Sequence, residues 1–165
     1  MGGGRAACGT LGCSRRMSRV HVRITIDAPI QDVWDTVMDP DRLQEWVTIH
    51  RAVRNVSKQP FEPGATMDQV MHLRGLSFQV RWKLEEVTAP TYAEWDGRGP
   101  AHSRARIRYR LSEKEHEQTE FEYTNEFTPP GGRLGTLASR VIVGAASERE
   151  AHNSLSRLKK LIENR

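Results

Sequence analysis

Cysteine is scarce in this chain of 165 residues, and the scarcity excludes two kinds of structure. The two cysteines, Cys8 and Cys13, lie in the glycine-rich opening with no cysteine or histidine partner nearby, which argues against a zinc site. From Met17 onward there is no cysteine, so a disulfide framework cannot hold the domain together. This pattern favours a protein of the reducing cytoplasm.

The opening segment, residues 1–17, also lacks the apolar h-region of a secretory signal peptide. Its glycine-rich and polar composition predicts a disordered tail, with Met17 as an alternative start of the protein. A chain of this length can bury one core and is short for two. We therefore expect a single domain over residues 18–165.

Long apolar runs and a strong net charge are missing as well. No apolar run approaches the roughly 18 residues of a membrane span, so we expect no integral membrane contact. The net charge is +4, and the three arginines of residues 1–17, a segment without acidic residues, leave +1 for the rest. A charge this weak gives poor support for nucleic-acid binding, and we expect no nucleic-acid partner.

The spaced residues of common catalytic and metal sites do not occur in the chain. The six histidines form no His-x-x-x-His or His-x-x-Glu-His pair, and Ser147 lies in Gly-Ala-Ala-Ser-Glu rather than in Gly-x-Ser-x-Gly. The glycines of 97–99 and 131–135 do not join a strand to a helix as a phosphate-binding loop does. We expect neither a metal nor a cofactor.

The hydrophobic pattern that is present predicts an α+β domain in which strands outnumber helices. Apolar and polar residues alternate with period two in seven segments, which indicates half-buried strands. These segments are 20–27, 47–56, 67–73, 76–85, 91–96, 102–111 and 119–127. Helical spacing of apolar residues predicts a helix over 30–38, a second short one over 40–46, and a long one from Gly132 to Arg165.

Four arginines alternate along the segment 102–111, at positions 104, 106, 108 and 110. Such a ladder suggests nucleic-acid binding until its neighbour is considered. The following segment alternates glutamates at 120, 122 and 126, and in a hairpin the two charged faces fall on the same side of the sheet. We expect cross-strand ion pairs on a solvated outer face.

The long C-terminal helix carries an apolar stripe, and Glu148 falls on it. Glu148 is seven residues from both Val141 and Leu155, which puts it within about 20° of the centre of the stripe. The small residues just before it, including Ala145, would leave room for a ligand against the sheet. The alternative is a structural glutamate paired with Arg140 or Arg149.

Several motifs in this order resemble the SRPBCC superfamily, the START-like group that includes polyketide cyclases, lipid-transport proteins and pollen allergens. They are residues 26–35 (IDAPIQDVWD), residues 38–46 (MDPDRLQEW), residues 95–97 (WDG), and Tyr123 followed by residues 129–135 (PPGGRLG). The resemblance covers about residues 18–163. It implies the helix-grip fold: a curved antiparallel sheet of about seven strands wrapped around the C-terminal helix, in β-α-α-β6-α order, enclosing an apolar cavity.

The inward faces of the expected strands are mixed in a way that is typical of small-molecule pockets, which are apolar with a few polar groups. At any single aromatic position, plain core packing is the more common role. The predicted ligand-binding residues are Met67, Gln69, Met71, Phe78, Val80, Trp82, Trp95, Tyr109, Phe121, Tyr123, Val141, Ala145 and Glu148. Candidate acid or base groups are Glu148, Tyr109, His50 and Glu94, none with an identifiable partner.

Three functions remain open on the sequence. The first is a binding protein that holds a hydrophobic ligand, lipid or polyketide-like, between sheet and helix. The second is an enzyme of the aromatase/cyclase kind. The third, implied by the resemblance of residues 43–50 (LQEWVTIH) to a toxin subgroup, is the toxin of a toxin–antitoxin pair, with a protein partner.

Overall fold

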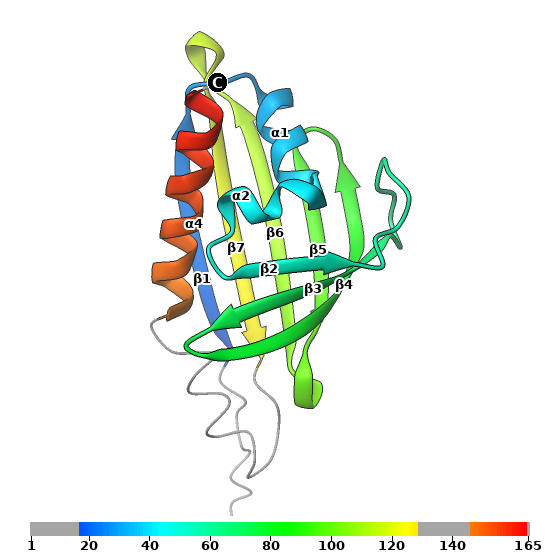
Figure 1. Cartoon of the computed structure of the whole chain (residues 1–165). Helices are drawn as coiled ribbons and strands as arrows, with labels where there is room; N and C mark the ends of the chain where they lie inside the picture. The colour runs from blue at the N-terminus through cyan, green and yellow to red at the C-terminus, as the bar shows by residue number, and fades with distance from the viewer. Residues whose placement is uncertain (1–16, 129–145, 165) are drawn as a thin grey trace, which may run out of the picture.

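The computed structural model of the protein describes residues 17–128 and 146–164 (Figure 1). The elements follow the predicted order of one strand, two helices, six strands and a helix. They are β1 (Ser18–Ile26), α1 (Ile30–Met38), the 3-10 turn η1 (Pro40–Arg42), α2 (Leu43–Trp46), β2 (His50–Arg54), β3 (Thr66–Leu73), β4 (Leu76–Thr88), β5 (Tyr92–Arg98), η2 (Pro100–His102), β6 (Arg104–Glu113), η3 (Glu115–Glu117), β7 (Thr119–Thr128) and α4 (Ala146–Glu163).

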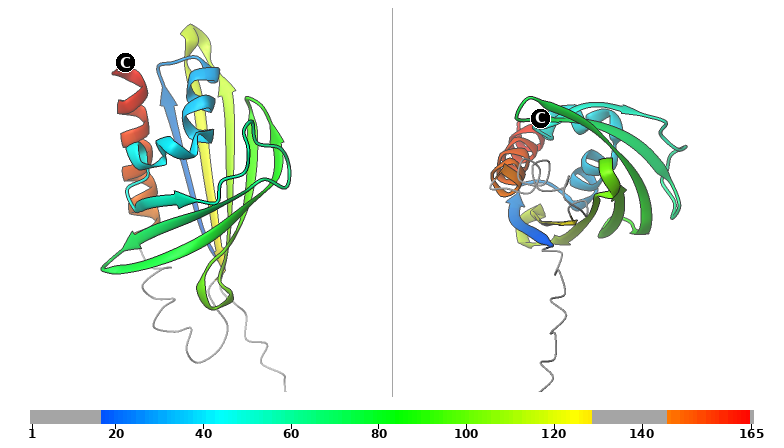
Figure 2. Two further views of the ribbon diagram at one scale, coloured as in Figure 1. Left: turned by 45° about the vertical axis from the view of Figure 1, so that its right-hand side comes forward. Right: turned by 90° about the horizontal axis from the view of Figure 1, so that it is seen from below.

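The seven strands form one antiparallel sheet in the order β1-β7-β6-β5-β4-β3-β2. Register shifts between His50 and Ala52 and between Leu84 and Glu86 interrupt two of its ladders, and irregularities of this kind bend a sheet. The view from below in Figure 2 shows the sheet curling around, with α4, α1 and α2 completing the ring. This is the helix-grip architecture that the sequence predicts.

The helices bury the apolar faces that their spacing predicts. On α1, Ile30, Val33, Trp34 and Val37 are all buried, and Pro29 precedes the first turn. On α4, Leu155, Leu158 and Ile162 are buried, with exposures of 1%, 0% and 5%. The predicted helix from 132 to 145, with Val141 and Ala145, lies outside the described residues.

Helix α4 is attached to the edge strand β1 by side-chain contacts to the backbone. Lys159 Nζ donates to the carbonyl oxygen of Thr25 at 2.6 Å, and the amide of Asp27 donates to Glu163 Oε1 at 2.8 Å. These bonds satisfy backbone groups at an edge that would otherwise remain open. They also fix which side of α4 faces the interior.

The outer face of the sheet carries the predicted ion pairs. Arg108 contacts Glu94 at 2.7 Å and Glu126 at 3.2 Å, and Arg23 contacts Glu122 at 2.8 Å. Of the predicted ladder, Arg106 and Arg108 thus pair with carboxylates of the neighbouring strands, and Arg108–Glu126 is a predicted pair between β6 and β7; Glu94 of β5 is a partner that was not predicted. In the described part of the chain, no helix is both long enough and apolar enough to cross a membrane.

Candidate ligand-binding site

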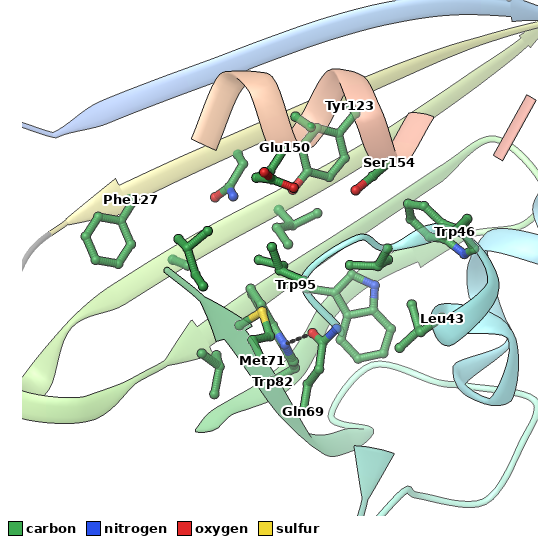
Figure 3. A pocket seen from close by; sticks show the side chains of 18 of the residues that line it. Leu43, Trp46, Gln69, Met71, Trp82, Trp95, Tyr123, Phe127, Glu150 and Ser154 are labelled. Carbon is green, nitrogen blue, oxygen red and sulfur yellow. Dashed lines mark hydrogen bonds between the residues drawn. The ribbon is translucent and has the colours of Figure 1, made fainter. Parts of the chain in front are cut away.

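A cavity of about 150 Å³ lies between the inner face of the sheet, α2 and α4 (Figure 3). Its walls are side chains of β3 to β7, of α2 with the turn that follows it, and of α4. Most of them are apolar or aromatic, and the polar exceptions are few. An apolar hollow with a small number of polar groups is the usual character of a small-molecule site.

Gln69 anchors the floor of the cavity through two buried hydrogen bonds. Trp82 Nε1 donates to Gln69 Oε1 at 2.9 Å, the bond drawn dashed in Figure 3, and Gln69 Nε2 lies 3.0 Å from His50 Nδ1. Indole can only donate, so the Gln69 oxygen must face it and the amide nitrogen must face His50. His50 Nδ1 is therefore an acceptor and carries no proton.

Gly97 makes room for the ring of Trp82. The two residues are opposite one another on β5 and β4, and a Cβ at Gly97 would lie 2.4 Å from Trp82 Cζ3. Side-chain carbons do not approach that closely, so position 97 can carry only hydrogen without displacing the indole. The glycine of the Trp95-Asp96-Gly97 motif thus shapes the cavity wall.

Two tyrosines stand side by side on the wall formed by β6 and β7. Tyr109 and Tyr123 are register partners, with ring centroids 6.1 Å apart. Burial, with a smaller contribution from the Tyr123 hydroxyl, raises the pKa of Tyr109 above its ordinary value. Burial also raises the pKa of Tyr123 to about 12, although the nearby Asn125 side chain lowers it. Both phenols therefore stay protonated at neutral pH and can donate hydrogen bonds.

Helix α4 contributes Glu150 and Ser154, one turn apart, to the cavity. Both contact Thr48 in the turn between α2 and β2. Thr48 Oγ1 donates to Glu150 Oε2 at 2.5 Å, and the Thr48 amide donates to Ser154 Oγ at 3.1 Å. The turn thus fixes the position of a carboxylate at the edge of an otherwise apolar cavity.

Two lining side chains have buried polar atoms that find no hydrogen-bond partner within residues 17–128 and 146–164. They are Trp46 Nε1 and Asn125 Oδ1. Buried polar atoms in native proteins are nearly always paired, so each is a place where a ligand or water can bind. The same residues include no group of three His, Cys, Asp or Glu side chains arranged to hold a metal ion.

Comparison with models of known protein families identifies the family that has this fold. A family described as "Polyketide cyclase / dehydrase and lipid transport" matches residues 17–163. The chain belongs to this family. The match spans every element of the sheet and all of α4.

Proteins that resemble this chain differ widely from it in sequence. The aromatase/cyclase Zhui from Streptomyces sp. R1128 has a similar fold, with a TM-score of 0.76 and 17% identity over 91% of this chain and 96% of that one. Ara h 8.0201 aligns with a TM-score of 0.66 and 9% identity over 91% and 100%. A curated protein, Toxin Rv0910 of Mycobacterium tuberculosis, is 22% identical over 100 residues, 61% of this chain and 69% of its own length. The SRPBCC resemblance is thereby confirmed, and the two structural similarities concern the fold alone.

Most of the side chains predicted to bind ligand face the cavity of this family member. Those that line it are Met67, Gln69, Met71, Phe78, Val80, Trp82, Trp95, Tyr109 and Tyr123. Val141 and Ala145 lie outside the described residues. Contact with a ligand stays a prediction for every one of these positions.

Glu148 and Phe121 are not on the cavity wall, contrary to the prediction. Glu148 is exposed, because α4 presents the side bearing Glu150, Ala151 and Ser154 to the cavity. Residues 148 and 150 point about 160° apart on a helix of 3.6 residues per turn. Phe121 is fully buried and packs edge-on against Tyr109 at 5.4 Å, so it supports the wall from the core side.

The other two candidate acid or base groups are also directed elsewhere. Glu94 is on the outer face of the sheet. Partial burial opposes its ionisation, but hydrogen bonds from Arg108 and Tyr92 hold its pKa below the ordinary value. His50 is buried behind the cavity wall, and burial lowers its pKa. Neither side chain lines the cavity.

Sequence reasoning missed the contribution of α2 and of the polar side of α4. The additional lining residues are Leu43, Trp46, Val47, Ile49, Leu73, Ala105, Ile107, Asn125, Phe127, Glu150, Ala151, Ser154 and Leu155. A signal was present for some of them. Leu43 and Trp46 are three residues apart, and Glu150 and Ser154 are four apart, so each pair shares one helix face.

Proposed function

We propose that the protein binds a hydrophobic small molecule, lipid or polyketide-like, in the cavity between the sheet and α4. The observation that carries the proposal is the cavity itself: about 150 Å³ of space enclosed mainly by apolar and aromatic side chains. Empty apolar space costs a protein stability, since its lining side chains lack packing partners. A bound apolar molecule would restore those contacts. The cytoplasmic location that the cysteine-free domain predicts stays a prediction.

Filling the cavity from within tests the proposal. Ala105 lines the cavity from β6, and Arg104 beside it is exposed on the opposite face of the strand. Ala105→Phe should weaken binding of propylbenzene at least tenfold in isothermal titration calorimetry, and Arg104→Phe should change it less than twofold. Native mass spectrometry of the freshly purified protein would identify a natural ligand. Equal affinities for the two variants would show that propylbenzene binds elsewhere.

A second candidate function, cyclisation of a reactive chain, is favoured by the chemistry of three lining residues. Glu150 carries a carboxylate that could take a proton from carbon, and the protonated phenols of Tyr109 and Tyr123 could donate to a ketone oxygen. Incubation with a linear β-polyketone tests it. Cyclised product that disappears in Glu150→Gln would support an enzyme, and identical product yields with and without protein would exclude one for that substrate.

A third candidate, a toxin that acts through a protein partner, rests on the similarity to Toxin Rv0910. That similarity covers 61% of this chain at 22% identity. Induced expression in a bacterial host, compared with expression of the Ala105→Phe variant, would test it. Normal growth of the host during expression would argue against a toxin.

A further inference from the structure

We infer that the ligand of this cavity is amphipathic and that its polar end is a hydrogen-bond donor without negative charge, a hydroxyl or an amine. That end would bind against Glu150 and Ser154 of α4 and Asn125 of β7. The inference rests on the proposed function, because it specifies the ligand of the same cavity.

The first observation is that polarity is concentrated on one wall. In Figure 3, Tyr123, Glu150 and Ser154 lie together along α4, and Met71 and Trp82 lie on the opposite side. Gln69 is the polar residue on that opposite side, and both ends of its amide are already bonded to Trp82 and His50. A ligand therefore meets an apolar wall at one end and a polar wall at the other.

The second observation is that the polar wall offers acceptors beside the phenol of Tyr123, which can itself both donate and accept. Thr48 Oγ1 gives its single proton to Glu150, so in its 3.1 Å contact with Ser154 Oγ the serine is the donor. Within the described ranges, Glu150 Oε1 accepts no hydrogen bond, and Asn125 Oδ1 is buried without a partner. Asn125 Oδ1 is the buried acceptor of the two, and a buried acceptor left unmatched is costly, whereas Glu150 is half-buried. A ligand hydroxyl or amine can donate to both.

The third observation concerns charge. Glu150 is the one charged side chain among the described residues that line the cavity. A ligand carboxylate would place a second negative charge beside this half-buried carboxylate, and like charges close together repel. A hydroxyl avoids this, and an amine is attracted both to Glu150 and to the faces of the surrounding aromatic rings.

The size of the cavity limits the ligand further. An engineered apolar cavity of about 150 Å³ holds a benzene molecule. The present cavity has the same order of volume, so the enclosed part of the ligand is about one ring with a short substituent. A matched series of one-ring compounds is therefore suitable as a probe.

The experiment compares four such compounds by isothermal titration calorimetry: propylbenzene, 4-propylphenol, 4-propylbenzylamine and 4-propylbenzoate. Each is titrated into the wild-type protein, Glu150→Gln and Glu148→Gln. The last variant is a matched control, since Glu148 is on the same helix, loses the same charge and is exposed away from the cavity. Thermal unfolding checks that all three proteins are folded.

We expect the phenol or the amine to bind at least tenfold more tightly than the benzoate. Glu150→Gln should reduce that ratio at least fivefold, and Glu148→Gln should leave it unchanged. A preference for phenol would identify a neutral hydroxyl ligand, and a preference for amine a cationic one; both support the inference. The inference would be overturned if 4-propylbenzoate bound as tightly as 4-propylphenol, or if the two glutamine variants had equal effects. In either case, binding of propylbenzene would still support the proposed function. Failure of all four compounds to bind would overturn both.

Discussion

Replacement of Gly97 by alanine tests how the cavity wall is built. The added Cβ would lie 2.4, 2.7 and 2.9 Å from three carbons of the Trp82 ring, and ordinary contact begins near 3.4 Å. The indole must therefore retreat by about 1 Å. It has little room to do so, because Trp82 is 3% exposed and its Nε1 donates to Gln69 at 2.9 Å.

The expected loss of stability follows from these contacts. Overpacking of this kind costs about 1–3 kcal/mol. Loss of the Trp82–Gln69 bond would leave a buried donor unpaired, at about 1–3 kcal/mol. Alanine also makes the unfolded chain less flexible than glycine does, which offsets about 0.4–1 kcal/mol of this loss of stability. A net destabilisation of about 3 kcal/mol is the central expectation, which in a domain of this size lowers the melting temperature by about 6–12 °C.

Circular dichroism at increasing temperature measures this loss, and a double-mutant cycle identifies its cause. In Trp82→Phe the ring that would meet the new Cβ is smaller, so Gly97→Ala should cost at least about 1.5 kcal/mol less in that background than in the wild type. Equal losses in both backgrounds would refute the reasoning, because the destabilisation would then have nothing to do with the indole.

Three further predictions concern the sheet, the buried histidine and the turn before β2. The double change Arg106→Gln and Arg108→Gln should leave 4-propylphenol affinity within twofold in calorimetry, because both arginines lie on the outer face; loss of binding would mean that this face had been assigned wrongly. Burial lowers the pKa of His50, so the unfolded chain takes up the proton first, near its ordinary pKa of about 6.5. Stability should be full above that pH and decrease as the pH falls from about 6.5 towards the folded-state pKa. Urea unfolding at pH 7.5 and 5.5 should therefore show a smaller pH dependence in His50→Leu than in the wild type, and an unchanged dependence would contradict this assignment. Thr48→Val removes a hydroxyl that bonds two residues of α4 and should cost about 1–2 kcal/mol in urea unfolding, whereas Thr25→Val, at an exposed position of β1, should cost little. Equal losses in the two variants would show that the bonds of Thr48 to α4 contribute nothing measurable.

The strands could be predicted from the sequence because one face of the sheet is buried. Alternation between Ile107, Tyr109 and the arginines around them leaves one face apolar, and a shift of one residue would bury the charges. The ion pair of Arg108 with Glu126 then followed from the glutamates of the next strand. Strand ends were less accurate. The segment 47–56 was predicted as one strand, but β2 spans only His50–Arg54, because the backbone before His50 forms the turn that follows α2.

The rotation of α4 about its own axis could not be predicted from periodicity. A stripe through Leu155, Leu158 and Ile162 is compatible with a range of rotations of α4, and only some of them turn Glu148 towards the cavity. The docking bonds of α4 to β1, through Lys159 and Glu163, select one rotation. They involve backbone groups more than 130 residues away in sequence, which no local pattern contains.

Gln69 shows why cavity-lining residues and ligand-binding residues must be separated by experiment. Its amide oxygen and nitrogen each hold one wall residue, Trp82 and His50, and one N–H and one lone pair of the amide are left over. Gln69→Leu would weaken binding, because the indole would lose its acceptor and the wall would move. Loss of affinity at this position therefore does not by itself identify a contact with the ligand. A shift of the apolar wall does not change the preference between 4-propylphenol and 4-propylbenzoate. A substitution that does change this preference would therefore identify a residue that contacts the polar end of the ligand.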